Sequence, residues 1–208
     1  MNEIKLKLSD EENEMCSKTL IIGGFGTGTY TCFRYMVLKE KTKSILIDDY
    51  SNKDLIKILE KDNLDTFFYK DTFDENKIIN FNKLDKIFIN LLEANLYNTN
   101  IFHLKNLVLR VGYNFNQISI FKKFGVDSIL KKFDKILVFS PKSFNNDDDD
   151  IKNLLKFSLP REIYPYIDMF NGKVEEFIEI KKNSIKYKVL NIPYEDFEKM
   201  HNRLIYNY

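Results

Sequence analysis

The stretch GGFGTGTYT, residues 23–31, decides how this 208-residue chain is interpreted. It holds four of the seven glycines of the chain: Gly23, Gly24, Gly26 and Gly28. The apolar run TLII (19–22) precedes it, and an apolar pattern of helical spacing (30–39) follows. A strand, a glycine-rich turn and a helix place backbone amides and the positive end of a helix where a phosphate group binds. The stretch therefore predicts a phosphate-binding loop, but one without a lysine.

Bulk properties indicate one globular domain, residues 1–208. The chain is 44% hydrophobic and 30% charged, with a formal net charge of +1, so charge gives no strong signal for nucleic-acid binding. Residues 1–18 are charged and lack the apolar centre of a signal peptide, and we expect a flexible or accessory segment there. No apolar run approaches the ~18 residues of a membrane span, which predicts a cytoplasmic protein.

Residues suited to metal binding or covalent catalysis are few and scattered. The chain has two cysteines, Cys16 and Cys32, and two histidines, His103 and His201. Cys32 lies in an apolar helical stretch and is most simply a small core residue. No nucleophile has an evident histidine base. We expect no metal site and no catalytic residue.

Short apolar runs alternate with helical patterns along the chain, which predicts an α/β fold: a three-layer sandwich with a mostly parallel central sheet. The predicted strands are 19–22, 44–47, 86–89, 106–111, 135–139, 163–167 and 187–192. The predicted helices are 30–39, 52–60, 118–133, 151–157, 174–181 and 194–208.

One functional interpretation is a methyltransferase that uses S-adenosylmethionine. The GFGTG loop is followed by ILIDDY, whose Asp48 or Asp49 would bind the ribose hydroxyls of that cofactor. Two features oppose it: Ile22 stands where an acidic residue is expected before the glycines, and the closing antiparallel hairpin of that fold is hard to place.

A second interpretation accounts for more of the chain. IIGGFGTGTYTCFRYMVLKEKTKSILIDDY resembles the opening of the MinD/ParA family of deviant Walker ATPases, and it is most similar to the CpaE/TadZ branch. NLVLRVGYNFNQISI resembles the second-switch strand and loop of the family, and FDKILVFSPKSFNNDDDDIKNLL its next strand, turn and helix. IYPYIDMFNGKVEEFIEI resembles the base-recognition segment and YKVLNIPYEDFEKM the late IPYD segment. The resemblance implies a P-loop NTPase fold.

The charged residues on which the chemistry of the family depends are missing. By the resemblance, Thr27 takes the place of the phosphate-binding lysine and Ile22 that of the signature lysine. Gly28 takes the place of the magnesium-holding hydroxyl residue, with Thr29 one step away. Arg110 replaces the second-switch aspartate. In the register of a standard P-loop, Thr29 and Tyr30 occupy the Lys and Ser/Thr positions, and a lysine is absent there too.

The base-recognition asparagine of the family falls at or near Asp168, with Asn171 as a replacement. Asp48 resembles the first-switch acid, but one carboxylate does not make a magnesium-nucleotide site. We expect the degenerate loop, together with Asp48 and Asn171, to bind ATP or ADP weakly or not at all, without rapid hydrolysis. A slow genuine ATPase remains an alternative.

The resemblance implies a positioning or scaffolding protein. It would pair with itself or with a related protein through the glycine-loop face, where Ile22, Phe25 and Arg110 are the interface candidates. It would recruit a partner such as a pilus, secretion or partition-type assembly.

Residues 194–208 form a predicted amphipathic helix with Phe197, Met200, Leu204, Ile205 and Tyr208 at helical spacing. We favour packing of this helix on its own sheet. The alternative is a weak peripheral contact with a membrane surface.

Overall fold

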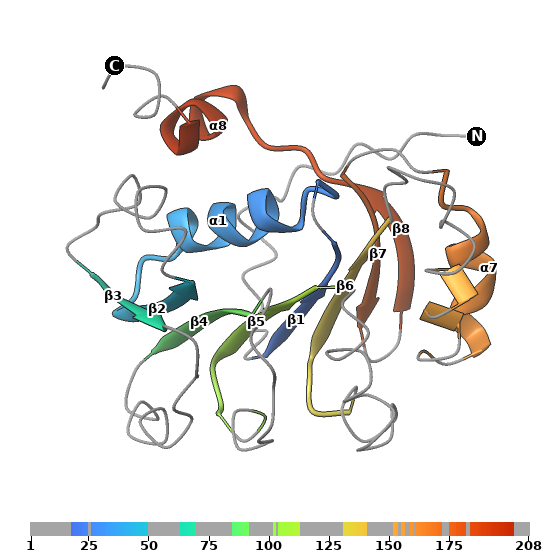
Figure 1. Cartoon of the computed structure of the whole chain (residues 1–208), viewed down its shortest axis with the longest axis horizontal. Helices are drawn as coiled ribbons and strands as arrows, with labels where there is room; N and C mark the ends of the chain where they lie inside the picture. Colours follow the sequence, from blue (N-terminus) through green and yellow to red (C-terminus); the bar gives the residue numbers. More distant parts are fainter. Residues whose placement is uncertain are drawn as a thin grey trace.

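The computed structural model of the protein describes residues 18–24, 26–49, 63–69, 85–91, 102, 104–112, 131–140, 152–153, 155–156, 159, 161–171, 175–181 and 184–201. Within these residues, an eight-stranded sheet in the order β3-β2-β4-β5-β1-β6-β7-β8 forms the centre of the molecule (Figure 1). The strands are β1 (Thr19–Ile22), β2 (Ser44–Asp49), β3 (Leu64–Tyr69), β4 (Lys86–Leu91), β5 (Leu107–Val111), β6 (Lys135–Phe139), β7 (Glu176–Lys181) and β8 (Ser184–Val189). β1 to β6 run parallel, whereas β7 and β8 pair antiparallel.

Both faces of the sheet are buried, as the continuous apolar runs predict. Side chains alternate between the faces, so Leu20 and Ile22 belong to one hydrophobic cluster and Ile21 to the other. The Ile21 face is covered by α1 (Thr29–Lys39). The Ile22 face is covered at β6–β8 by η5 (Arg161–Ile163) and α7 (Tyr164–Asp168). The three-layer α/β sandwich with a mostly parallel sheet is therefore confirmed.

The first helix is anchored to the sheet by aromatic packing. Phe33 is 1% exposed, and its ring meets that of Phe88 edge to face at a centroid distance of 5.9 Å. Burying one such side chain contributes about 1.5–3 kcal/mol. Cys32 is buried beside it, which confirms a core position for this cysteine, and burial raises the pKa of its thiol to about 12.

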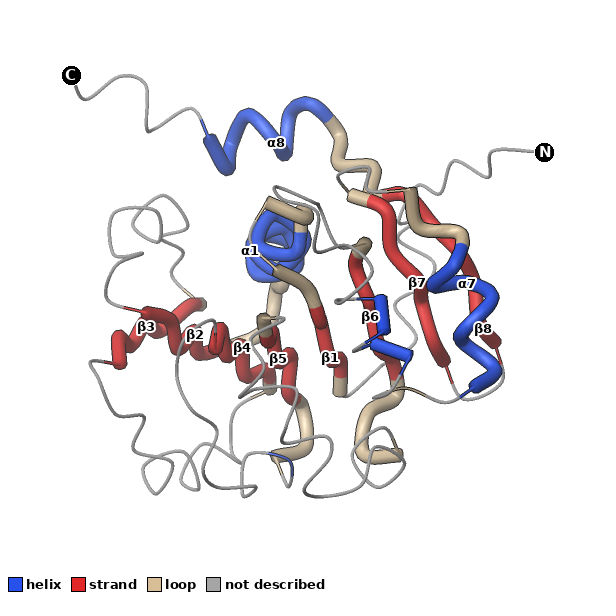
Figure 2. The backbone as a smooth tube through the Cα atoms, turned by 45° about the vertical axis from the view of Figure 1, so that its right-hand side comes forward, coloured by secondary structure: helices blue, strands red, loops and turns tan. Residues whose placement is uncertain are grey.

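The last helix, α8 (Tyr194–His201), lies on the outer side of α1, so that α1 is enclosed between the sheet and α8 (Figure 2). Met200 is fully buried in this contact. Lys39 of α1 forms an ion pair with Asp196 of α8 at 2.7 Å. The last helix was expected to pack on the sheet, but residues 194–201 pack on α1 instead, because α1 already covers this face of the sheet. Residues 202–208 lie outside the described residues.

Two elements differ in type from the prediction. Residues 163–167 were expected to form a strand, but they belong to η5 and α7. Pro165 explains the difference, because it lies in the first turn of α7, where its missing N–H breaks no helical hydrogen bond. Residues 174–181 were expected to be helical, but 176–181 form strand β7. A short apolar run is compatible with the period of a helix and with that of a strand. Here the pairing of 176–181 with β6 and β8 stabilises the strand.

One strand was not predicted, and another begins earlier than expected. β3 was missed, although its sequence LDTFFY is rich in strand-forming aromatic residues. The strand expected at 187–192 begins earlier, at Ser184, and forms the hairpin with β7 that the sequence analysis could not place. The helices expected at 52–60 and 118–133 lie outside the described residues. Of 151–157, the described residues 152, 153, 155 and 156 are helical.

A buried ion pair joins β7 and β8. Lys188 donates to Glu179 at 2.7 Å, both side chains are almost fully buried, and Lys135 lies 3.6 Å from the same carboxylate. Burial raises the pKa of Glu179, but the hydrogen bond from Lys188 and the nearby lysine charges outweigh it and hold this pKa below its ordinary value.

The lowered pKa makes a prediction about acid stability. The stabilisation from ionised Glu179 is present above its unfolded pKa of about 4.3 and is lost as the pH falls through the lower folded pKa. Glu179→Gln should cost about 2 kcal/mol at neutral pH, the range of a charge-assisted hydrogen bond. It should also flatten the acid limb of the stability curve. Urea unfolding between neutral pH and pH 2 measures both, and an unchanged acid limb would contradict the assignment.

Candidate functional site

The glycine loop joins β1 to α1 at the carboxyl edge of the parallel strands, where ligands bind in open α/β sheets. Gly26 (φ 73°) and Gly28 (φ 91°) adopt left-handed conformations that favour glycine. Gly28 is the N-cap of α1, and the helix begins at Thr29. This geometry matches the standard P-loop register, in which Thr29 holds the lysine position and Tyr30 the Ser/Thr position.

Threonine hydroxyls brace the loop from inside. Thr27 Oγ1 donates to the Gly24 carbonyl at 2.8 Å, and Thr29 Oγ1 lies 3.3 Å from the same oxygen. Both threonines are almost fully buried. The loop is also tied to the sheet, because the Gly23 amide donates to the Val111 carbonyl at 3.1 Å. Its conformation is therefore held by contacts within the protein.

Beneath the loop, three neighbouring parallel strands each place one polar side chain on the face that α1 covers. Asp48 of β2, Asn90 of β4 and Arg110 of β5 occupy aligned positions, and each is at most 1% exposed. Arg110 Nη1 donates to Asn90 Oδ1 at 2.7 Å, and Asn90 Nδ2 donates to Asp48 Oδ1 at 2.6 Å. The Asn90 amide thus relays between a buried cation and a buried anion. We call these three residues the polar row.

The first turn of α1 covers the polar row. Arg110 Nη2 donates to Thr29 Oγ1 at 2.9 Å, and the Tyr30 hydroxyl donates to Asp48 Oδ2 at 3.1 Å. The Arg110 guanidinium also lies over the Tyr30 ring, 5.3 Å from its centroid. Burial, with a further contribution from Asp48, raises the pKa of Tyr30 well above its ordinary value, so its phenol remains a donor. The loop and the row form one hydrogen-bonded unit.

A second acidic residue reaches the loop from β7. Glu175 has a left-handed backbone (φ 74°), and its amide donates to the Thr27 carbonyl at 3.1 Å. A Cβ atom on Gly28 would lie 3.0 Å from Glu175 Cγ. Burial raises the pKa of the Glu175 carboxyl. A strained non-glycine backbone is found where surrounding structure imposes it, here through the hydrogen bond to the loop.

The structure brings together most of the predicted site residues: the four glycines, Thr27, Thr29, Asp48 and Arg110. The side chain of Asp49 and all of Phe25 lie outside the description. Asp168 ends α7, is 57% exposed at its side chain and forms an ion pair with Lys156. Asn171 follows α7, a helix rather than the strand that was expected to carry a base-recognition loop.

Two dimer-interface candidates are not on the surface. Ile22 is 3% exposed and packs in the core, and Arg110 is 1% exposed within the polar row. Neither side chain is accessible to a second protein in this structure. Physically, both lie at the ends of central strands that are covered by neighbouring strands and helices.

The sequence analysis did not identify Asn90 or Glu175 as site residues, and it named Tyr30 only as the residue at the Ser/Thr position of the loop. A signal existed for Asn90, because it directly follows the apolar run KIFI, as Asp48 directly follows ILI. Parallel strands bring such ends to one edge. No comparable signal existed for Glu175, which reaches the loop only through the antiparallel pairing of β7.

Within the described part of the chain, no three His, Cys, Asp or Glu side chains lie together in a way that would hold a metal ion. Nor, among the helices described, is there one with the length and apolar character required to span a membrane.

Comparison with known proteins reveals similarity at the level of structure. No protein-family profile and no curated protein sequence matches the chain. The solved genome packaging NTPase B204 from Sulfolobus turreted icosahedral virus 2 does resemble it. The complex with sulfate has a TM-score of 0.54 at 16% identity and covers 85% of this chain and 98% of that chain. The AMP complex has a TM-score of 0.52 at 15% identity, covering 84% and 98%. The AMPPCP complex has a TM-score of 0.51 at 14% identity, covering 85% and 99%.

Similarity at this level of identity shows the fold, which is that of a P-loop NTPase. It does not support the MinD/ParA family or its CpaE/TadZ branch, to which the sequence was likened. Short blocks in family order are explained by the alternation of strands and helices, which α/β folds share.

Proposed function

We propose that this protein is a P-loop protein that binds the phosphate groups of a nucleotide weakly, without magnesium, and does not hydrolyse it. The observation that carries the proposal is the hydrogen bond from Arg110 to Thr29. It places the guanidinium of a neighbouring strand at the helix position where a standard P-loop has its lysine.

Arg110 supplies part of what the lysine supplies. A guanidinium is always charged and binds phosphate oxygens through fixed donors. In this chain, however, it is buried and hydrogen bonded to Asn90 and Thr29. A phosphate must therefore compete with these partners, whereas a P-loop lysine reaches the phosphates on a flexible stem. The arrangement favours weak binding.

The magnesium site of active P-loop NTPases is replaced. Such proteins hold the ion with the Ser/Thr of the loop and an acidic residue. Here the Ser/Thr position is Tyr30, whose hydroxyl donates to Asp48. The phenol of Tyr30 and the carboxylate of Asp48 are thus hydrogen bonded to each other under α1. Without the ion and the lysine, charge that develops during phosphoryl transfer lacks two of its usual stabilising groups, which opposes hydrolysis.

The strand order opposes the methyltransferase alternative. In the Rossmann arrangement, order 3-2-1-4-5-6, the glycine strand lies beside the strand that carries the ribose-binding acid. Here β5 and β4 separate β1 from β2, which puts Asp48 about 14 Å away, three interstrand spacings. Asp48 is also buried under Tyr30 and bonded to Asn90.

A slow nucleotide hydrolase of the packaging type is the second candidate. The fold comparison favours it, because the similar structures are those of a genome packaging NTPase in complex with nucleotides. The two candidates differ in one measurable property, which is whether magnesium promotes binding and turnover.

Calorimetric titration with ATP, ADP and inorganic phosphate, each with and without magnesium, tests the proposal. We expect weak binding, about 100 μM or weaker, since both cationic anchors of a magnesium triphosphate site are lost. We expect magnesium to leave the affinity unchanged or to lower it, and we expect no phosphate release above background. Magnesium-dependent turnover that Gly26→Val abolishes would overturn the proposal in favour of the slow hydrolase. No binding of any of the three probes would overturn both.

The variant Glu175→Gln tests how the charge of this side chain affects phosphate binding. It removes a negative charge beside Gly28 and changes no other group, so it should strengthen phosphate binding severalfold, an effect of ordinary size for a partly exposed charge. Because burial raises the pKa of Glu175, binding to the wild-type protein should also strengthen as the pH falls and the carboxyl takes up a proton. The variant should lose that part of the pH dependence.

We also propose a scaffolding role in a larger assembly. We propose pairing with itself or with a related protein independently of nucleotide. Size-exclusion chromatography with and without ATP distinguishes the cases: a monomer that pairs only when ATP is added would contradict this role.

A further inference from the structure

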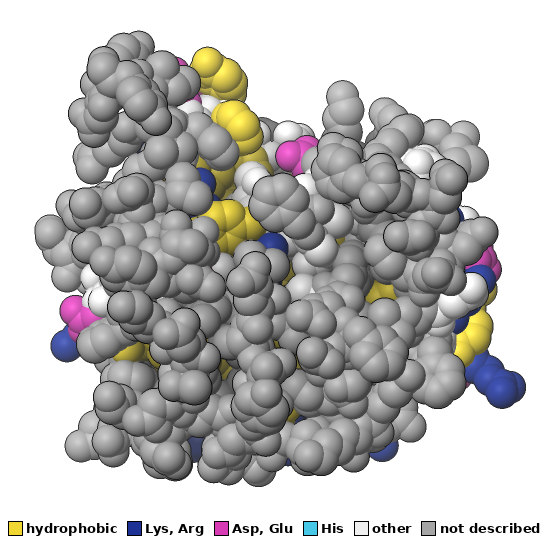
Figure 3. All heavy atoms as spheres, viewed as in Figure 1, with side chains coloured by type: hydrophobic (Ala, Val, Ile, Leu, Met, Phe, Trp, Pro, Cys, Tyr) yellow, Lys and Arg dark blue, Asp and Glu magenta, His cyan; other side chains and the backbone are white. Residues whose placement is uncertain are grey.

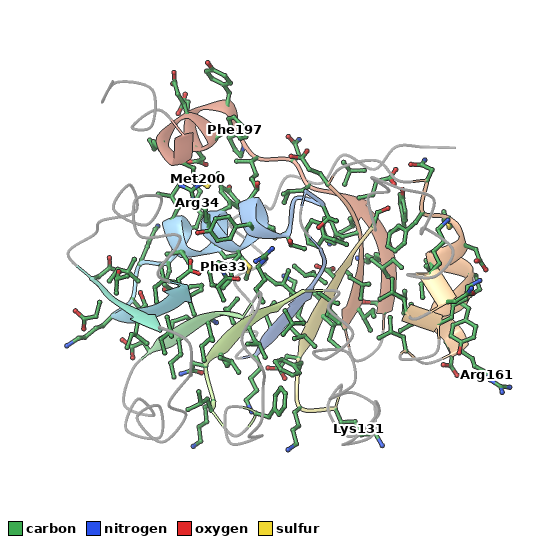
Figure 4. The ribbon with its side chains drawn as sticks, in the orientation of Figure 1. Phe33, Arg34, Lys131, Arg161, Phe197 and Met200 are labelled. Atoms are coloured by element: carbon green, nitrogen blue, oxygen red, sulfur yellow. The ribbon has the colours of Figure 1, made fainter. Side chains whose placement is uncertain are left out.

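Arg34, in the middle of α1, connects α8 with the first turn of α1. Its side chain points from α1 toward α8, where Met200 lies (Figure 4). Arg34 is 4% exposed, and its Nη2 donates to the Met200 carbonyl at 2.6 Å. A positive group at the last turn of a helix also interacts favourably with the helix dipole. The hydrogen bond therefore holds the carboxyl end of α8 on α1.

The same guanidinium lies 5.7 Å from the centroid of the Tyr30 ring, one turn earlier in α1. The second guanidinium near this ring is that of Arg110. The Tyr30 hydroxyl in turn donates to Asp48 in the polar row. A continuous series of contacts thus runs from the Met200 carbonyl through Arg34 and Tyr30 to the polar row, and from Arg110 to Thr29 at the start of the helix.

α8 has the properties of an element that docks marginally. It has eight residues, and isolated helices shorter than about 12–15 residues are marginal in water. Its docking depends on buried Met200, on the Arg34 hydrogen bond and on the Lys39–Asp196 pair, in which the lysine is half exposed. Two of its aromatic side chains, Tyr194 (75%) and Phe197 (40%), are exposed. Hydrophobic atoms are visible at the top of the molecular surface (Figure 3). Elements held by few buried contacts open locally at a lower free energy than that of global unfolding.

We propose that docking of α8 on α1 is coupled to the conformation of the glycine loop through Arg34 and Tyr30. Undocking removes the Met200 acceptor from a buried guanidinium. Arg34 then shifts from the Tyr30 ring. The hydrogen bonds from Tyr30 to Asp48 and from Arg110 to Thr29 weaken as a result. Coupling of this kind is reciprocal, so a change in the loop also alters the docking of α8. The inference does not depend on what the loop binds.

Hydrogen exchange of the full-length protein, read by mass spectrometry, tests the coupling. Asp196→Asn weakens docking from the α8 side, far from Tyr30. It should speed exchange of the amides of 194–201 about fivefold, the size of an ion pair and a helix-end charge together. It should also speed exchange of the amides of 26–32 about threefold, within the usual range of coupling between sites. The amides of β4 serve as an internal control and should not change.

Arg34→Met separates coupling from general loosening. If the contact series carries the effect, Asp196→Asn on the Arg34→Met background still speeds exchange of α8 but no longer changes that of 26–32. Arg34→Gln, which keeps a donor for the Met200 carbonyl but removes the cation from the Tyr30 ring, provides the comparison if the methionine variant does not fold. An equal response of 26–32 with and without Arg34, or no response in the wild-type background, would overturn the proposal.

Discussion

Replacement of Asp48 by alanine is expected to lower the free energy of unfolding by about 3–5 kcal/mol, the cost of removing one partner from a buried charged network. Asp48 is 1% exposed and accepts hydrogen bonds from Asn90 at 2.6 Å and from Tyr30 at 3.1 Å. Its removal leaves both donors in the protein interior without this acceptor. It also leaves the buried Arg110 charge without the anion at the other end of the relay.

Urea unfolding measures the change in the free energy of unfolding. Two further variants separate the effect of the charge from that of the buried position. Asp48→Asn retains a carbonyl acceptor without the charge and should cost less than the alanine variant. Asp65→Ala removes the same carboxylate from an exposed position on the neighbouring strand β3, and it should stay within about 0.5 kcal/mol of wild type. If Asp48→Ala and Asp65→Ala had the same effect, the polar row would contribute nothing to stability.

Gly23→Ala is expected to cost about 3 kcal/mol, at the upper end of the usual penalty for overpacking. A Cβ atom on Gly23 would overlap Thr29 Cγ2 and lie 3.0 Å from both Phe139 Cβ and Thr27 Oγ1. Gly23 does not have a left-handed backbone. The penalty is therefore steric: the added methyl group has no space between the end of β6, the loop and the first residue of α1.

The double variant Gly23→Ala, Thr29→Ser tests this cause directly. Serine lacks the Cγ2 methyl that overlaps the new Cβ, but it keeps the hydroxyl that accepts from Arg110. It should recover more than half of the stability lost in Gly23→Ala, as measured by thermal and urea unfolding. Thr29→Ser alone should have a small effect. A double variant no more stable than Gly23→Ala would show that backbone strain, not the methyl overlap, causes the loss.

The polar row shows how far a sequence can predict a site. Asp48 and Arg110 were singled out at the ends of their strands, and the carboxyl edge of the sheet was expected to hold the site. Their connection was not predictable, because it depends on which strands are neighbours. β4 lies between β2 and β5 in the sheet, so Asn90 joins the two charges. Strand order is a property of the assembled sheet and leaves no local mark on the chain.

The register of the loop is a similar case. The sequence allowed Thr27 or Thr29 at the lysine position, since a glycine directly precedes each of them. The structure favours Thr29, because α1 begins there and Gly28 caps it in a left-handed conformation. The sequence did not fix this start, because Gly28 provides no side-chain hydrogen bond to the first turn of α1.

The sequence by itself determined that the chain folds as an α/β sandwich with a glycine loop at the edge of the sheet, and that this loop has no lysine. Local physics suffices for these features, since apolar runs, helical periods and clustered glycines act over a few residues. The tertiary structure alone decided that Arg110 donates to Thr29, that Tyr30 donates to Asp48, and that 176–181 form a strand. Each of these depends on contacts between segments far apart in the chain, and their free energy arises only when the strands pair and α1 packs on them.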